Sequence, residues 1–372
     1  MASRKSSPKT AAERKKVESG KNVIDVKTPL DDDLNHSIRE NTKERIFLSI
    51  DAIDSTKLKS SLAAKQGSTP AVWAKDFAIF LTEIAAFYQG EFVAAIDKHC
   101  PDNCPSKRLH RMQESSPQKV KVWKYIGDEV VLVAELTCDK HQPSLHVLAL
   151  ANTIKQFNRK FGKNNPNKIR FKGTAWVAGF PVRNIEINLP GPEGQEVKDF
   201  LGPSMDLGFR LSKAASDDRL LISASLAYLI VKEASMDKPI KLNNNKEYNR
   251  LPLCFGGLTE FKGITNKHPL IWYSVNETPE SGLCSVEHEE LETFLRKNSF
   301  INKEIPPFIL GIGDVSPKYV EKYKEAVKEQ EKVPGSPFYP KGEQLISSTK
   351  EGVATTSELD ALFEDISSKL AK

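Results

Sequence analysis

The sequence predicts an α+β fold in which a mixed β-sheet is covered by helices. Short apolar or alternating runs, typical of strands, recur through residues 43–275, and longer amphipathic runs, typical of helices, lie between them. The two kinds of run do not alternate strictly, as they would in a parallel α/β fold. Beyond residue 276 the pattern becomes helical and charged, which indicates a helical C-terminal extension over 276–372.

The first part of the chain carries its excess charge. Residues 1–22 hold seven basic and two acidic side chains, which accounts for the formal net charge of +5. We therefore interpret residues 1–42 as a basic, flexible leader, with a weak tether to an anionic surface as the alternative. Because the rest of the chain is charge-balanced, no nucleic-acid partner is expected.

The composition indicates a cytoplasmic protein without a membrane span. The N-terminus is charged and lacks an apolar signal segment, and the most apolar stretch, 77–96, contains Glu83 and Glu91. Five cysteines in 372 residues fit a reduced compartment.

The pattern of apolar residues places the expected elements. Strands are expected at 45–50, 120–126, 129–136, 169–180, 182–189, 220–223, 253–261 and 269–275. Helices are expected at 71–98, 145–161, 205–215, 225–233, 286–297 and 316–332. A proline-containing linker, 333–340, should precede a short amphipathic helix at 357–371. A sensor, a dimer brace and a plain extension all remain open for 276–372.

Two aspartates are candidates for metal binding. Asp51 ends the first apolar strand, and Asp128 lies in the Gly127-Asp128 turn of a predicted hairpin. A buried carboxylate needs a compensating partner, and Mg²⁺ prefers carboxylate and phosphate oxygens. Aspartate at a strand end is also common as a plain turn residue.

The turn after Asp51 is a candidate phosphate site. The expected helix start at Asp54, Ser55 and Thr56 offers capping side chains, and the backbone from Ile53 onward offers N–H groups.

Five segments together resemble the catalytic domain of class III adenylyl and guanylyl cyclases. The opening motif is Phe47-Leu-Ser-Ile-Asp-Ala-Ile-Asp-Ser-Thr56, and the hairpin motif is Lys124-Tyr-Ile-Gly-Asp-Glu129. The others are Asp199-Phe-Leu-Gly-Pro-Ser-Met-Asp-Leu-Gly-Phe-Arg-Leu211, Leu220-Leu-Ile-Ser223, and Leu258 to Gly263 with Pro269 to Tyr273. They occur in the family's order over 43–275, which the resemblance identifies as the catalytic domain of a class III nucleotide cyclase-like sandwich.

The resemblance implies a role for each matched residue. Asp51 and Asp128 would bind two divalent cations, Mg²⁺ or Mn²⁺, with help from the carbonyl of Ile53, for in-line displacement at a nucleoside triphosphate. Arg210 would stabilise charge on the α-phosphate, and Lys124 and Asp199 would contact the base. The family completes each site with two domains, so the resemblance implies a homodimer with shared active sites.

Two segments depart from the family pattern. Asp206 stands where the family has an asparagine that contacts the ribose, and 174–183 lacks the usual Gly-Ile-His-Thr-Gly run. Asp206 and Arg210 are four residues apart, so a surface salt bridge on one helix face is an equal alternative to a catalytic role.

The expected base contacts favour cytosine or adenine. Asp199 can accept a hydrogen bond from an exocyclic amine, and Lys124 can donate one to a ring nitrogen. Guanine and uracil present the opposite edge, a carbonyl beside an N–H. Strict alternation along the strand would place Trp123 and Tyr125 on the face opposite Lys124.

The departures, together with Asp199–Leu211, look most like the pyrimidine cyclases of bacterial Pycsar anti-phage systems. That resemblance implies a pyrimidine triphosphate substrate and a separate effector that responds to the cyclic product. With the base edge, it favours conversion of CTP to 3′,5′-cyclic CMP and diphosphate. An adenylate cyclase, a uridylate cyclase and an inactive cyclase-like regulatory domain remain as alternatives.

Overall fold

The protein is described here from a computed structural model. It describes residues 32–64, 71–100, 120–136, 142–163, 168–191, 195–233, 235–236, 238–241, 247–276, 285–298, 300 and 315–340. The chain divides into two units, residues 1–39 and residues 40–372, and the second contains the sheet and the candidate site.

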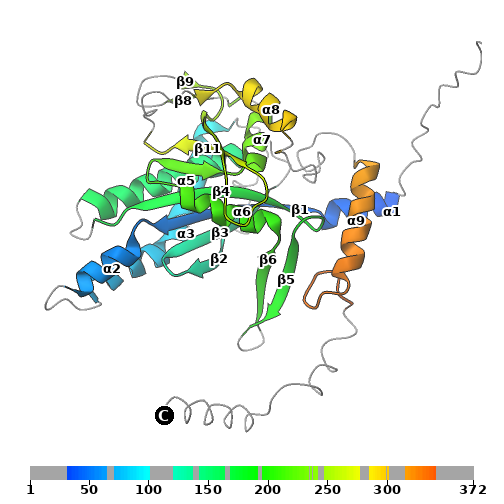
Figure 1. Ribbon diagram of the computed structural model, residues 1–372, viewed down its shortest axis with the longest axis horizontal. Helices are drawn as coiled ribbons and strands as arrows, with labels where there is room; N and C mark the ends of the chain where they lie inside the picture. Colours follow the sequence, from blue (N-terminus) through cyan, green and yellow to red (C-terminus); the bar gives the residue numbers. More distant parts are fainter. Residues whose placement is uncertain are drawn as a thin grey trace, which may run out of the picture. The chain divides into compact units, whose positions relative to one another are not determined.

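A mixed sheet forms the centre of the second unit (Figure 1). In the described residues its strands follow the order β12-β10-β11-β7-β4-β1-β3-β2. β4 and β7 run parallel, and the other neighbours are antiparallel. The strands are β1 (Lys43–Ala52), β2 (Lys121–Ile126), β3 (Glu129–Glu135), β4 (Phe171–Phe180), β7 (Arg219–Ile222), β10 (Leu253–Thr259), β11 (His268–Ser274) and β12 (Ser285–Val286). The expected α+β class, a mixed sheet with helices, is confirmed.

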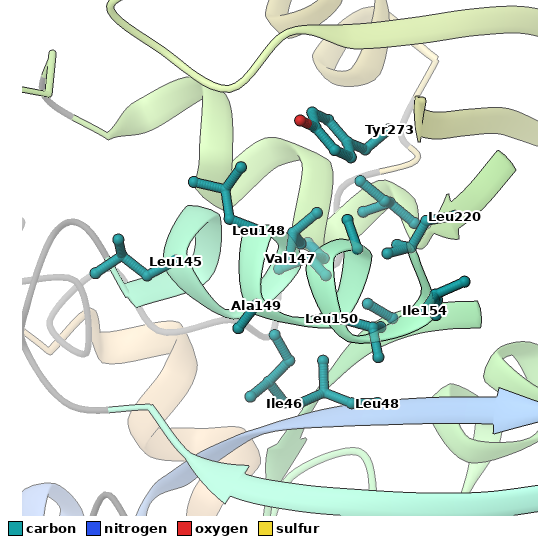
Figure 2. Close-up of a cluster of buried hydrophobic side chains, with 14 of the residues drawn as sticks. Ile46, Leu48, Leu145, Val147, Leu148, Ala149, Leu150, Ile154, Leu220 and Tyr273 are labelled. Atoms are coloured by element: carbon teal, nitrogen blue, oxygen red, sulfur yellow. The ribbon is translucent and has the colours of Figure 1, made fainter. Parts of the chain in front are cut away.

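Helices cover one face of the sheet, which we call the core face. They are α3 (Ala71–His99), α5 (Gln142–Asn158) and α7 (Ala224–Lys232), and a π-helical turn, Arg159–Lys163, continues α5. Figure 2 shows side chains of α5 packed between Ile46 and Leu48 of β1 and the residues Leu220 and Tyr273 of β7 and β11. Thirteen residues of α5 are buried, so the helix is enclosed on most of its sides, as a central core helix is.

The long helix α3 is a core helix with a marked apolar composition. By length and composition alone, its stretch Ala74–His99 is the one described helix that could cross a membrane. Its side chains Phe80, Ile84, Tyr88 and Phe92 are nevertheless buried in the core beneath the sheet. Tyr88 also hydrogen-bonds the buried ring of His146 on α5 at 2.6 Å, as expected of a helix packed against protein.

The opposite face of the sheet, which we call the site face, carries the odd-numbered side chains of β1. Alternation along a strand places Phe47, Ser49 and Asp51 on this face, whereas Ile46 and Leu48 lie in the core. An aromatic cluster covers part of the site face. Its buried members are Phe47, Val131, Val133, Trp176, Ala178, Phe180, Phe200 and Met205, and Trp123 and Phe209 pack against it.

Helix α6 (Pro203–Leu211), followed by a 3₁₀ turn at Ser212–Ala214, packs on this cluster through a glycine. The Cα of Gly208 lies so close to Trp176 that a Cβ would overlap the indole ring. We expect Gly208→Val to force α6 from the sheet and to lower the free energy of unfolding by about 1–3 kcal/mol, as overpacking does. Chemical denaturation would measure this loss, and an unchanged transition midpoint would contradict the close packing. The variant Leu201→Val, at an exposed residue shortly before α6, serves as a control for side-chain change nearby.

A two-stranded ribbon, β5 (Ile185–Pro190) and β6 (Glu196–Leu201), projects from the sheet (Figure 1). The sequence pattern predicts a strand at 182–189 but none at 196–201. β5 starts later because residues 181–184 form a turn after Phe180. The ribbon is fastened to the sheet by Arg45, which donates to Glu186 at 2.8 Å and lies over the ring of Phe200.

The described part of the C-terminal extension packs against the sheet and helices that precede it. Helix α8 (His288–Lys297) contacts α7, and β12 joins the sheet beside β10. Helix α9 (Pro317–Gln330) begins at the cap Ser316, whose side chain accepts from the amide of Tyr319. Residues 333–340, expected as a linker, form turns in which Ser336 is buried. The expected helix at 357–371 lies outside the described residues, and the domain boundary at 275 stays a prediction.

Residues 1–42, expected to be a flexible leader, include one helix. Helix α1 (Asp32–Asn41) has the basic residue Arg39 in its last turn, where the helix dipole favours positive charge. Residues 1–31 lie outside the described part of the chain.

Candidate active site

Two carboxylates meet at one end of the site face. Asp51 lies at the end of β1, paired in register with Glu129 on β3 and with Lys172 on β4. Asp128 lies in the turn that joins β2 to β3, where Gly127 has a positive φ of 66°. The predicted hairpin is confirmed, and it brings Asp128 close enough to Asp51 to influence its pKa.

Lysines compensate both carboxylates. The Nζ atom of Lys172 lies 3.4 Å from a carboxylate oxygen of Asp51, and that of Lys59 lies 3.7 Å from one of Asp128. Lys172 also donates to the carbonyl oxygen of Ser212, at the end of α6, at 3.0 Å. The sequence analysis assigned no role to either lysine, because their proximity depends on strand register and helix packing rather than on a local motif.

The acidic groups are partly desolvated. Burial raises the pKa of Asp51, and the neighbouring Asp128 raises it further, whereas Lys172 lowers it. Burial also raises the pKa of Glu129, against the hydrogen bond that Ser49 donates to it at 2.5 Å. A group of carboxylates held together at this energetic cost is suited to a cation.

These residues fit divalent metal ions whose coordination shell is completed by a substrate. Among the described residues, no group of three or more histidine, cysteine, aspartate or glutamate side chains is arranged to hold a metal ion. Mg²⁺ commonly uses only one or two carboxylates together with water and substrate phosphates. Asp51 and Asp128 meet that requirement, so the residues present fit the two cations that the sequence analysis expects.

Lys172 should compete with such a cation. We expect Lys172→Met to tighten Mn²⁺ binding by about tenfold, because removing a positive charge next to Asp51 is worth more than about 1 kcal/mol at a partly buried site. Manganese titration followed by electron paramagnetic resonance, without nucleotide, would measure it. Lys213→Met, an exposed lysine nearby, is the matched control. Equal or weaker binding in Lys172→Met would show that Lys172 is no competitor.

The turn after β1 forms as expected, but one of its donors is already used. The amide of Ile53 donates to the carbonyl of Arg170 at 2.8 Å, so it is not open to a phosphate. Asp54 adopts a left-handed conformation with φ 54°, and α2 (Ser55–Ala63) begins directly after it. Of the three predicted phosphate contacts, Asp54 and Thr56 are exposed, whereas Ser55 is buried and does not face solvent.

The two residues expected to contact a base meet on the site face. The Nζ atom of Lys124, on β2, lies 2.7 and 2.9 Å from the two carboxylate oxygens of Asp199, on β6. Asp199 also accepts from the indole Nε1 of Trp123 at 3.0 Å and from the amide of Phe200 at 2.9 Å. Three of these four contacts involve Oδ1, which leaves Oδ2 with the larger capacity to accept another hydrogen bond.

A β-bulge corrects the expected orientation of Trp123. The register between β2 and β3 shifts between Val122 and Lys124, so Trp123 is an extra residue that breaks the two-residue alternation. Lys124 then pairs with Val131, which belongs to the aromatic cluster, and Trp123 packs edge-on against Phe47. The prediction that Trp123 lies on the face opposite Lys124 was therefore wrong.

Asp206 and Arg210 lie on α6 without pairing to each other. Asp206 is exposed, Arg210 is half-buried, and no ion pair joins them among the described residues. The structure therefore does not form the surface salt bridge considered from their spacing. A cavity of about 880 Å³ borders Asp206, Ser204 and Arg183, together with the segment 263–268.

The geometry thus defines the chain as an α+β domain. Two carboxylates meet at one edge of its sheet, and a Lys–Asp pair joins the sheet to the β5–β6 ribbon. No family model matches the sequence, and no curated protein matches it. Among solved structures, it is similar to the guanylyl cyclase Cya2, with 12% identity over 66% of this chain and 98% of that chain and a TM-score of 0.38.

Two further solved structures are similar at the same level. The adenylyl cyclase CyaB from P. aeruginosa shares 14% identity, covering 66% of this chain and 98% of that chain, with a TM-score of 0.37. The guanylate cyclase domain of RhGC from Catenaria anguillulae, solved in complex with GTP, shares 15% identity over 62% and 95% of the chains, also with a TM-score of 0.37. Because these identities and TM-scores are low, any function for this chain has to be argued from its own residues.

Proposed function

We propose that this chain is a class III-type nucleotide cyclase that converts CTP to 3′,5′-cyclic CMP and diphosphate. One observation carries the proposal. The motifs that resemble the family's catalytic domain are far apart in sequence, yet Asp51, Asp128 and Lys124 lie together on the central sheet, and Asp199 reaches Lys124 from the β5–β6 ribbon. A chance resemblance of short motifs would give no reason for such convergence.

The acidic edge would hold the triphosphate end of the substrate. Asp51 and Asp128 would bind two divalent cations, with the Ile53 carbonyl assisting. Cations held there supply Lewis-acid charge near the 3′-hydroxyl and the phosphates. The oxygen of the 3′-hydroxyl bonds to the α-phosphorus, the bond to the β-phosphate oxygen breaks, and the hydroxyl proton passes to solvent. Lys59 and Lys172, which neutralise these carboxylates in the absence of cations, would then help to neutralise phosphate charge.

The Lys124–Asp199 pair would select the base. Two of the three N–H groups of Lys124 are directed at Asp199, which leaves a third donor. Together with the spare capacity of Oδ2, the pair offers one acceptor and one donor side by side. Cytosine presents a matching N4 amine beside N3, and adenine presents N6 beside N1. The resemblance to Pycsar pyrimidine cyclases favours cytosine, and it implies a role in bacterial anti-phage defence with a separate effector for the cyclic product.

The remaining catalytic residues are proposed to act across a homodimer. The family resemblance implies that Arg210 and Asp206 serve the site of a second subunit, with Arg210 stabilising charge on the α-phosphate. Their position on the solvent-facing side of α6, without pairing to each other, supports that proposal. An inactive cyclase-like domain is the second candidate, because aspartate replaces the asparagine usual at 206.

The deciding experiment supplies each of the four ribonucleoside triphosphates to the purified chain with Mn²⁺ and identifies the products by mass spectrometry. Cyclic CMP as the main product is the expected result. The control pair is Asp51→Asn, which should be inactive, and Asp97→Asn, an exposed residue of α3, which should be unaffected.

Each other product would change a different part of the proposal. Cyclic AMP would retain the chemistry and remove the pyrimidine assignment. Cyclic UMP would contradict the role given to the Lys124–Asp199 edge. Absence of any product would favour the inactive candidate, and activity per subunit that stayed constant down to a demonstrated monomer would contradict shared sites.

A further inference from the structure

The ribbon that carries Asp199 is fastened to the sheet near its root. Phe200 is buried in the aromatic cluster, Arg45 pairs with Glu186, and Trp123 and Lys124 of β2 donate to Asp199 itself. Beyond these residues β5 and β6 pair only with each other in the described sheet order, and two-stranded ribbons are marginally stable in water. A contact residue for a base must be held in place within about 0.5 Å, so support for the outer part of the ribbon matters as well.

The C-terminal segment 315–340 reaches the ribbon at its outer edge. The amide of Asn188, on β5, donates to the carbonyl of Gly335 at 2.8 Å. Asn188 is paired in register with Lys198, the residue immediately before Asp199. Gly335 has a positive φ of 82°, and a Cβ there would overlap the carbonyl oxygen of Asn188. This approach therefore requires glycine at 335.

Helix α9 is itself anchored to the sheet at both ends. The hydroxyl of Tyr319, in its first turn, lies 3.3 Å from the hydroxyl of Thr42, which directly precedes β1. The side chain of Gln330, its last residue, is buried and donates to the carbonyl of Pro181, which directly follows β4, at 2.6 Å. Lys43 and Phe180, next to these two anchors, are paired in register. α9 thus spans one end of the central strands.

The hold on the ribbon is concentrated at few points. A cavity of about 470 Å³ lies between the turn at 181–185 and α9, bordered also by Gly202, Lys322 and Glu329. Over this stretch α9 does not pack closely on the ribbon's root. Gln330, at the ribbon's root, and Gly335, at β5, therefore carry much of the connection between segment 315–340 and the ribbon. Single substitutions can test that connection.

We propose that segment 315–340 is a brace that holds the β5–β6 ribbon, and with it Asp199, in position for a nucleotide base. That the segment holds the ribbon in place, the mechanical part of this proposal, is independent of the proposed function. Its consequence for base selection rests on the proposed function. Gln330 and Gly335 are positioning residues in this account, since neither contacts Asp199.

Hydrogen exchange of the full chain, measured by mass spectrometry, tests the mechanical part. Gln330→Glu keeps the size of the side chain but removes the donor to Pro181, and Gly335→Val prevents the approach to Asn188. We expect amides of β5 and β6 (185–190 and 196–201) to exchange about tenfold faster in both variants, while those of β1 stay unchanged. Lys324→Ala, on the exposed face of α9, is the matched control and should match the wild type.

A spectroscopic signal reports on Asp199 directly. With 5-fluorotryptophan incorporated, the fluorine resonance of residue 123, assigned with Trp123→Phe, should shift or broaden in both brace variants because its indole donates to Asp199. Unchanged exchange in β5 and β6 in both variants, with an unchanged resonance, would overturn the brace. If Gly335→Val also loosens β1, its backbone is broadly disrupted and Gln330→Glu decides.

The enzymatic consequence is measured separately. The ratio of kcat/KM for CTP to that for GTP should fall in both brace variants, with little change in the Mn²⁺ dependence set at the other end of the site. A loosened ribbon in a chain whose wild type makes no cyclic nucleotide would uphold the brace and contradict the proposed function. A loosened ribbon with an unchanged ratio in an active enzyme would refute the link to base selection.

Discussion

Replacement of Asp51 or Asp128 by asparagine is expected to lower kcat at least about a hundredfold, because each change removes a proposed ligand whose charge stabilisation is worth several kcal/mol. The neutral side chain keeps the volume of the carboxylate. The wild-type chain should also gain thermal stability when Mn²⁺ and a non-cyclisable triphosphate analogue are added, since a ligand that binds only the folded state stabilises it. Both variants should lose that gain.

The apoprotein provides the control for this experiment. Burial and Asp128 raise the pKa of Asp51, so its carboxylate is held at a cost that Lys172 only partly offsets. Asp51→Asn should therefore fold as well as the wild type without metal, within about 1 kcal/mol. Melting measured by circular dichroism would establish this. A variant that kept full activity, or the full metal-dependent gain, would refute the assignment of Asp51.

Glu44 is expected to make the free energy of unfolding fall as pH rises. Its side chain on β1 is 1% exposed, and neither carboxyl oxygen has a hydrogen-bond partner among the described residues. Burial raises its pKa from 4.5 to about 8. The folded state then keeps the proton between these values while the unfolded state releases it, so unfolding becomes more favourable across that range. At about 1.4 kcal/mol per pKa unit, the change can reach a few kcal/mol.

Glu44→Gln should remove this dependence and stabilise the protein by about 1–3 kcal/mol at pH 8, with little effect at pH 4.5. Urea denaturation at several pH values would measure the difference between variant and wild type. The wild type must be subtracted because a second buried group also makes stability depend on pH. Burial lowers the pKa of His146 to about 3, so the free energy of unfolding falls as pH drops below 6.5. Glu196→Gln, exposed on β6, is the control. A difference that does not grow with pH would mean that Glu44 is ionised or paired.

The parts of the fold that follow from local patterns could be predicted from the sequence. The apolar run of β1 and the Gly127-Asp128 turn identify the central strand and its hairpin, because both depend on neighbours in sequence. The π-helical continuation of α5 and the late start of β5 were not predicted, since packing decides where such elements end.

The ribbon strand β6 escaped prediction for a different reason. Its residues Glu196-Val-Lys-Asp are mostly polar and exposed, so the sequence shows no strand-like burial there. Its partner β5 supplies the pairing, and the contacts with Gly335 and Arg45 come from segments far along the chain. Such long-range support leaves no signal in a local window.

The candidate site was predicted in its acidic residues and its Lys–Asp pair but not in its surroundings. Lys172 meets Asp51 only because β1 and β4 pair in one particular register. The sequence does not predict that Trp123 and Lys124 lie on the same face. A β-bulge interrupts the alternation there, and many sequences can form such a bulge. The large apolar side chain of Trp123 next to Lys124 is the only feature of the sequence that could have suggested the bulge.

The extra residue in β2 lets two neighbouring side chains face the same way. Without it, a strand that kept Lys124 opposite Val131 would turn residue 123 toward Leu132 and the core. Deleting Trp123 would leave Lys124 beside Asp199 but remove the indole N–H that donates to Asp199 and the ring that packs edge-on against Phe47. Insertion or deletion of a single codon can in this way add or remove one contact around the Lys–Asp pair without changing the pair itself.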